Sequence, residues 1–161
     1  WKLRNDDRVV VMERTNFRYV TPQDLIREMP DLATIDVSFI SLSLILPVLK
    51  TLLVPSSDVI ALIKPQFEAG REQVGKKGIV RDKKVHEAVI EKIIKLSIQE
   101  GYNVENLSFS PITGGEGNIE FLIHLQWSGQ NIDTEGTCNL TLSIKEVVEK
   151  AHSELSGRTD Q

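Results

Sequence analysis

The sequence predicts an α/β fold whose sheet is mainly parallel, with an antiparallel last strand and helices on both faces. Short apolar or β-branched runs alternate with helical patterns, an order typical of parallel sheets. The last two strand patterns are joined only by a glycine-rich turn at residues 111–117. They must be antiparallel neighbours, because a parallel pair needs a crossover of a dozen or more residues.

The first part of the chain contains two predicted strands and a short helix. Arg8 to Met12 is β-branched and predicts a buried strand. Thr21 is the expected N-cap of a helix with Pro22 at its first position, and this helix stops before Pro30. Residues 33–39 form the next predicted strand.

The middle of the chain alternates in the same way. A helix capped by a serine is expected over residues 41–52, followed by a continuous apolar strand at 58–63 that is covered on both faces. Residues 66–81 are polar and glycine-containing, which predicts a loop. A long helix is expected from the Asp82 cap to about Gly101.

The last part carries two strands and a final helix. Strands are predicted at 103–110 and 119–127, and a loop at 128–136. A capping box at 143–146 begins a helix that runs to about Leu155. We therefore predict a single domain over residues 1–161, in which 128–161 is a carboxyl-terminal loop and helix.

Composition narrows the function classes. A net charge of −4 argues against a free-standing, strongly basic nucleic-acid binder, but it allows a catalytic domain that acts on nucleic acid. The single Cys138 excludes a disulfide framework and a cysteine-based zinc site. His86, His124 and His152 lack metal-ligand spacing, so no metal is expected. No signal peptide or membrane-spanning run is recognisable, and a cytoplasmic location is expected.

Three apolar runs each carry one ionisable residue: Asp36, Lys64 and Glu120. An unpaired charge in a buried strand costs several kcal/mol, so a charged residue there is expected to have a partner or a functional role. Asp36 and Lys64 lie at the carboxyl ends of parallel strands, where sites form in open α/β sheets. The last strand runs the other way, so Glu120, at its beginning, is expected at the same rim. The alternative is a structural network of ion pairs.

Several segments resemble one known family. The chain is similar to the TlyA-type hemolysin family, RNA 2′-O-methyltransferases related to the FtsJ-like (RrmJ-like) rRNA methyltransferases. The resemblance covers nearly the whole chain, in order. Its segments are Trp1 to Arg4, Arg8 to Asn16, Asp36 to Leu42, Leu62 to Glu68, Gly78 to Asp82 and Gly117 to Leu122.

This resemblance implies a catalytic Lys-Asp-Lys-Glu tetrad, with Asp36, Lys64 and Glu120 as its last three members. It also implies a Rossmann-like methyltransferase sheet and S-adenosylmethionine as the cofactor. In the family, the first lysine, the glycine-rich cofactor loop, the acidic residue that grips the cofactor ribose and a small RNA-binding domain lie upstream of the segment matching Trp1. We therefore expect a truncated domain that lacks its amino-terminal strands and is inactive alone.

The resemblance also suggests binding residues. Glu13, Arg14, Thr15 and Asn16 are expected on the adenine side of the cofactor, with a plain strand-to-helix turn as the alternative. Arg71, Lys76, Lys77 and Arg81 lie in a basic segment that could follow RNA phosphates, although most charge runs are only solvated surface. The expected partner is rRNA or a ribosomal subunit. The sequence indicates no membrane and no protein partner.

Two other functions compete with an RNA methyltransferase. A membrane-active hemolysin is disfavoured, because the sequence offers no exposed cationic amphipathic helix. A catalytically inactive RNA-binding or scaffold domain stays open, because the cofactor loop is absent from this chain.

Overall fold

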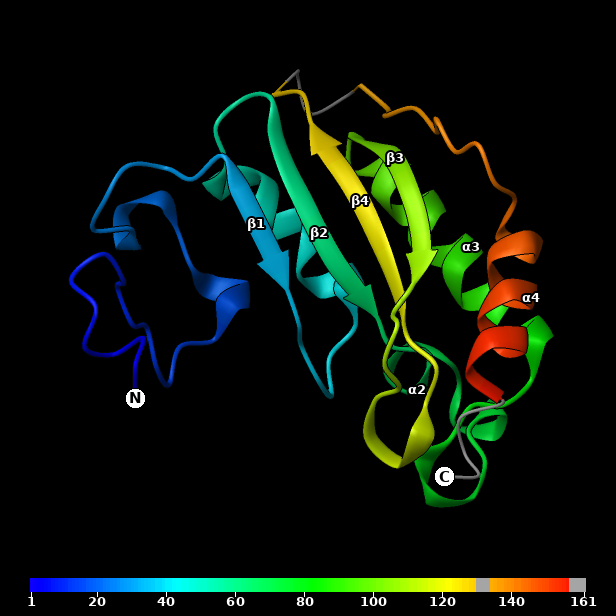
Figure 1. Ribbon diagram of the computed structural model, residues 1–161. Helices are drawn as coiled ribbons and strands as arrows, with labels where there is room; N and C mark the ends of the chain where they lie inside the picture. Colours follow the sequence, from blue (N-terminus) through cyan, green and yellow to red (C-terminus); the bar gives the residue numbers. More distant parts are fainter. Residues whose placement is uncertain (130–133, 157–161) are drawn as a thin grey trace.

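The computed structural model describes residues 1–129 and 134–156. Its sheet has the order β1-β2-β4-β3 (Figure 1). The strands are Leu32–Ile35 (β1), Ser57–Ile63 (β2), Tyr102–Phe109 (β3) and Phe121–Trp127 (β4). β1 and β2 pair in parallel, and β4 is antiparallel to both β2 and β3. Three strands thus share one direction and the last is reversed, which confirms the predicted sheet.

The helices follow their sequence signals. The first helical segment contains α1, Leu46–Leu49, between two 3-10 turns, Leu42–Leu44 and Lys50–Leu52. A short α2, Pro65–Glu68, follows β2 inside the predicted loop. The long α3 spans Lys83–Gln99 and α4 spans Ile144–Leu155.

Side-chain caps begin both longer helices where the sequence predicts them. Asp82 Oδ1 accepts a hydrogen bond from Lys84 N at 2.8 Å, and Ser143 Oγ accepts one from Glu146 N at 3.1 Å. Each cap satisfies a backbone N–H group that has no partner within its helix. Parts of the predicted 128–161 loop and helix, residues 130–133 and 157–161, lie outside the described residues.

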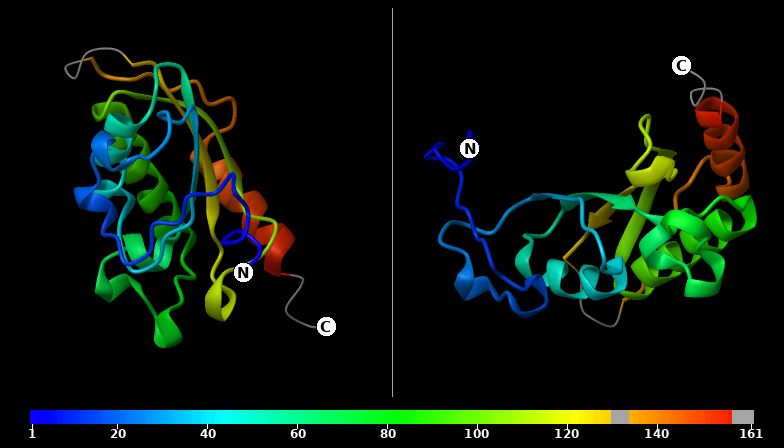
Figure 2. Two further views of the ribbon diagram at one scale, coloured as in Figure 1. Left: turned by 90° about the vertical axis from the view of Figure 1, so that its left-hand side faces the viewer. Right: turned by 90° about the horizontal axis from the view of Figure 1, so that it is seen from below.

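The helices that join the parallel strands lie on one face of the sheet. Figure 2 (left) shows α1 and α3, in cyan and green, on the same side of the strands. Right-handed crossovers explain this, because the steps from β1 to β2 and from β2 to β3 advance across the sheet in the same direction. The predicted second layer of helices is absent over β1, β2 and β4 in the described ranges. The order of the strands determines which face of the sheet the helices cover, and a sequence pattern does not reveal that order.

Burial along β2 differs from the predicted cover on both faces of this strand. Its residues alternate between buried and half-buried, with Val59 and Ala61 fully buried and Ile60 and Leu62 on the half-buried face. Apolar residues on both faces predicted cover on both faces, but only one is covered here. On that face, Tyr102 donates from its hydroxyl to the Leu46 carbonyl at 2.6 Å inside the core. α4 packs against α3 and β3.

Two predictions for the amino-terminal segment are wrong. Residues 8–12 form no strand, and Val9 to Met12 are 36–44% exposed. A β-branched run becomes a strand only when it pairs with another strand, and residues 8–12 pair with none of the four described strands. The helix expected before Pro30 is only a 3-10 turn, Pro22–Asp24, although Thr21 and Asp24 form its capping box.

Within the described ranges, no helix combines the length and hydropathy that a bilayer crossing requires.

Candidate functional site

Asp36, Lys64 and Glu120 line one pocket of about 580 Å³ at the rim of the sheet. Asp36 follows β1, Lys64 follows β2 and Glu120 precedes β4. Because β4 is reversed, its beginning lies at the same rim as the ends of β1 and β2. The sequence therefore predicted correctly that these three residues lie together.

Strand alternation also places the three side chains on one face. Asp36 continues the alternate positions of β1, and Lys64 continues Ile60 and Leu62 on β2. Leu62 pairs with Leu122, so extending this antiparallel register by two residues sets Lys64 opposite Glu120. The pocket therefore opens on the face of the sheet that carries no helix over β1, β2 and β4 in the described ranges.

Lys64 forms the central contact of the pocket. Its Nζ lies 2.5 Å from Asp36 Oδ1 and donates to Ser38 Oγ at 3.3 Å. The lysine side chain is 13% exposed, whereas that of Asp36 is 69% exposed. Asp36 thus stabilises the ammonium from the solvent side, and a ligand that displaces Asp36 would change the balance of charge around Lys64.

Glu120 is held more rigidly. It is 7% exposed, and its Oε2 accepts a hydrogen bond from Gln66 Nε2 at 2.8 Å. Gly114 lies so close that a β-carbon there would clash with this carboxylate. The Oε1 of Gln66 is buried and has no hydrogen-bond partner among the described residues. It is an acceptor that a ligand hydroxyl or a rearranged Lys64 could satisfy.

Glu68 connects the segments that carry Asp36 and Lys64. Its carboxylate accepts from Ser41 Oγ at 2.6 Å and from Leu42 N at 2.8 Å. Burial raises the pKa of Glu68, and these two hydrogen bonds oppose the rise. The contact fixes α2, directly after Lys64, against the turn that follows Asp36.

Asn118 organises the loops on the other side of the pocket. It is 3% exposed, and its Oδ1 accepts from Val80 N at 3.0 Å. Its Nδ2 donates to the carbonyls of Gly78 and Gly115, at 2.9 and 3.2 Å. One side chain thus ties the end of the basic segment to the turn before β4.

The predicted RNA-binding cations lie near the pocket to different degrees. Arg71, Lys76, Lys77 and Arg81 are all exposed. Lys77 lines the pocket and adopts a left-handed φ of 62°, whereas the other three do not line it. None of the four forms an ion pair with another residue in the described part of the chain, so their charges face solvent.

The predicted cofactor residues lie elsewhere. Arg14, Thr15 and Asn16 line a separate pocket of about 420 Å³, which shares no residue with the Lys64 pocket. Glu13 forms an ion pair with Arg4 instead. The described residues therefore do not form one continuous cradle for S-adenosylmethionine that reaches Lys64. No group of three or more potential metal ligands occurs within the same described residues.

Two pocket features escaped sequence reasoning. Phe39 is 89% exposed at the pocket, with a left-handed φ of 64° that non-glycine residues rarely adopt. Its ring packs at 4.7 Å from that of Phe67. The sequence pattern also does not single out Gln66, the partner of Glu120. Both lie in segments that carry the family resemblance, but the residue type alone does not reveal exposure or a hydrogen bond across 54 residues of sequence.

Several known proteins are similar to this chain in sequence. YqxC of Bacillus subtilis, whose name records a proposed rRNA methyltransferase, is 66% identical over 155 residues, 96% of this chain and 54% of that protein. The 16S/23S rRNA (cytidine-2′-O)-methyltransferase TlyA of Mycobacterium tuberculosis is 40% identical over 126 residues, 78% of this chain and 47% of that protein. The chain thus spans about half the length of these relatives.

A solved structure is similar to this chain in both fold and sequence. A hemolysin-named protein of Streptococcus thermophilus matches all of this chain and 56% of its own, with a TM-score of 0.91 and 51% identity. The family model for FtsJ-like methyltransferases matches residues 1–127. With its α/β sheet and these relatives, the chain belongs to the FtsJ-like methyltransferase family.

Proposed function

We propose that this chain is part of an S-adenosylmethionine-dependent rRNA 2′-O-methyltransferase and that the Lys64 pocket holds the ribose to be methylated. One observation carries the proposal: Asp36, Lys64 and Glu120 share one rim, one face and one pocket in a chain related to TlyA. The substrate would be rRNA or a ribosomal subunit, and the enzyme would work in the cytoplasm.

The proposed chemistry centres on the acceptor hydroxyl. A ribose 2′-hydroxyl must lose its proton, at least partly, to become a good nucleophile. Lys64 would steer or accept that proton, while Asp36 and Glu120 orient the lysine and the ribose. Help of this kind contributes roughly 10²–10⁴-fold to a rate, and alignment of the reactants supplies much of the rest. When bound, S-adenosylmethionine supplies a methyl group carried on a positively charged sulfur.

The surroundings of the pocket suit RNA. Phe39 offers an exposed ring at the pocket, and unstacked bases of RNA bind readily to such rings. Lys77 also lines the pocket and forms no ion pair within the described residues, so a phosphate could bind to it. Ring and cation therefore favour a single nucleotide that leaves its stack, rather than a continuous duplex.

Methyl transfer onto ribosomal subunits by the full-length protein tests the proposal. Labelled S-adenosylmethionine should deliver its methyl group to rRNA, and resistance of one internucleotide bond to alkaline hydrolysis should locate the product on a 2′-oxygen. RNA binding without transfer, together with no calorimetric binding of S-adenosylmethionine, would instead support the inactive scaffold.

A further inference from the structure

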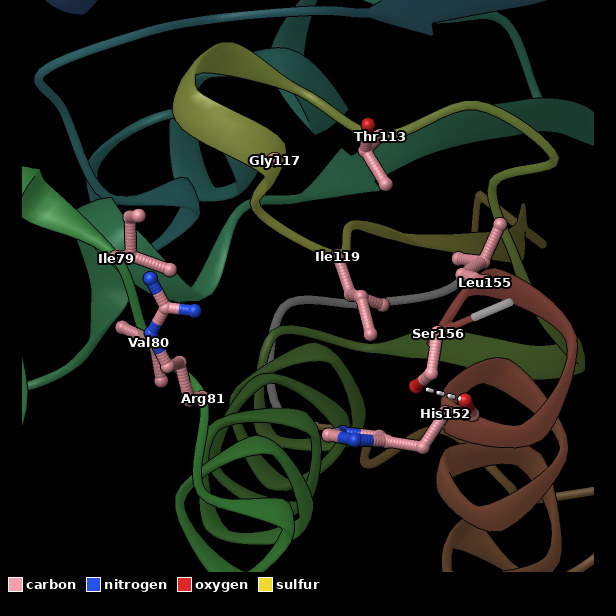
Figure 3. Close-up of a pocket in the computed structure, with 9 residues that line it drawn as sticks. All are labelled: Ile79, Val80, Arg81, Thr113, Gly117, Ile119, His152, Leu155 and Ser156. Atoms are coloured by element: carbon pink, nitrogen blue, oxygen red, sulfur yellow. Dashed lines mark hydrogen bonds between the residues drawn. The ribbon is translucent and has the colours of Figure 1, made fainter. Parts of the chain in front are cut away.

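A second cleft lies behind the loop that borders the Lys64 pocket. It has a volume of about 270 Å³. Figure 3 shows its three walls: residues 79–81, the loop with Thr113 and Gly117, and the end of α4, with Ile119 between them. We call it the α4 cleft. This volume is slightly below the range of about 300–1,000 Å³ that is typical of ligand sites, so a single nucleotide suits the cleft better than a larger cofactor.

The α4 cleft adjoins the Lys64 pocket directly. Thr113 lines both. Ile119 and Glu120 are consecutive, and Ile119 lines the α4 cleft while Glu120 lines the Lys64 pocket. This is the alternation expected of extended backbone. A single strand of RNA that crosses the 113–118 loop would therefore place neighbouring nucleotides in the two sites.

The chemistry of the α4 cleft fits a nucleotide. Ile79 and Leu155 are 7% and 6% exposed, and with Ile119 they give an apolar surface for a base. Arg81 is exposed and lines the same wall of the cleft as Ile79 (Figure 3). It forms no ion pair with any residue of the described chain, so its donors are available to a phosphate.

Two walls of the α4 cleft are fixed by one buried residue. His86 is fully buried, its Nε2 lies 2.9 Å from the Val80 carbonyl, and its Nδ1 lies 2.8 Å from His152 Nε2 on α4. An ion pair of 2.9 Å between Lys83 and Glu149 also joins α3 to α4. The α4 cleft is thus preformed, which reduces the entropy lost on binding.

We propose that the α4 cleft binds the ribonucleotide next to the target nucleotide, with its base on Ile79, Ile119 and Leu155 and its phosphate at Arg81. This inference rests on the proposed function. It assigns a substrate-binding role to α4, which provides one wall of the cleft, in addition to its packing against α3 and β3.

Amide NMR of the 161-residue chain tests the proposal with cytidine 5′-monophosphate at millimolar concentration. Shifts are expected at residues 79–81, 113–119 and 152–156. The variant R81Q should weaken binding of a short single-stranded RNA about 5–10-fold. The matched control K84Q removes an exposed charge outside the α4 cleft and should change binding less than 2-fold. Shifts confined to the Lys64 pocket, no shifts at all, or equal effects of R81Q and K84Q would overturn the proposal.

Methyl transfer by the full-length protein separates this inference from the proposed function. R81Q should raise the KM for RNA with little change in kcat. K64A should lose kcat and keep its affinity for RNA. If K64A retains transfer, the proposed function fails whatever the NMR result. If K64A is inactive and R81Q leaves KM unchanged, only the assignment of the α4 cleft fails.

Discussion

Lys64 and Asp36 form a 2.5 Å ion pair in which the lysine side chain is 13% exposed and the carboxylate side chain 69% exposed. The cation thus depends on a partner that solvent or a ligand reaches easily. A purely structural pair would gain little from this arrangement, because an exposed carboxylate is screened by water. A lysine that must respond to a bound substrate does gain from it.

The first prediction concerns Lys64. K64A should reduce methyl transfer by at least about 10²-fold, because it removes the group that we propose handles the hydroxyl proton. K64R should also fail, because a guanidinium stays protonated and cannot accept a proton. Transfer by the full-length protein is the measurement, and thermal unfolding checks the fold. K92A, which removes an exposed lysine of α3, is the control. Near-normal transfer by K64A would rule out the assignment.

The second prediction uses two adjacent glycines. G114A places a methyl group against the Glu120 carboxylate, whereas a β-carbon at Gly115 meets nothing within 4 Å. Gly114 has a φ of −79°, so alanine fits its backbone. G114A should therefore displace Glu120 and lower kcat by roughly tenfold or more, about 1.4 kcal/mol of transition-state stabilisation. G115A should leave kcat unchanged. Equal kinetics for both variants would show that the position of Glu120 does not matter.

The sequence alone predicted much of this fold and the centre of the site. Strand periodicity located the strands that begin near Ser57, Tyr102 and Phe121, and capping residues located α3 and α4. The reversal of the last strand followed from a turn too short for a crossover. That reversal was enough to bring Glu120 to the rim that holds Asp36 and Lys64.

Other features depend on information that local patterns do not contain. The β-branched run at residues 8–12 has strand propensity but no partner among the described strands, so tertiary context overrides propensity. Helices cover only one face of the sheet over β1, β2 and β4 in the described ranges, and this follows from the order of the strands. The contacts of Gln66 and Asn118 join residues 54 and 38 positions apart, and only the folded chain reveals them.

The third prediction concerns Asn118. N118A removes three hydrogen bonds and leaves the buried Val80 N–H unsatisfied, so it should lower the free energy of unfolding by about 2–3 kcal/mol. N118D keeps the acceptor for Val80 and loses the donor, so it should fall between N118A and the wild type. The control N5A removes an exposed hydrogen bond and should cost less than about 0.5 kcal/mol. Urea unfolding measures all three, and an N118A value equal to that of N5A would contradict the role of Asn118.

The fourth prediction concerns pH. Burial lowers the pKa of His86 from 6.5 to about 4, and the neighbouring His152 adds to this effect, while the Val80 carbonyl and Asp82 oppose it. The unfolded state therefore binds more protons than the native state between these values, so stability is full above pH 6.5 and falls as the pH drops towards 4. Between pH 7.5 and 5, His86 should account for a loss of about 2 kcal/mol in the free energy of unfolding.

Urea unfolding at both pH values should show a smaller loss in H86Q than in the wild type. The control N5A, which removes an exposed hydrogen bond and changes no ionisable side chain, should retain the wild-type pH dependence. NMR titration of the His86 ring in the wild type gives a second measurement, and a midpoint near 6.5 would contradict the prediction.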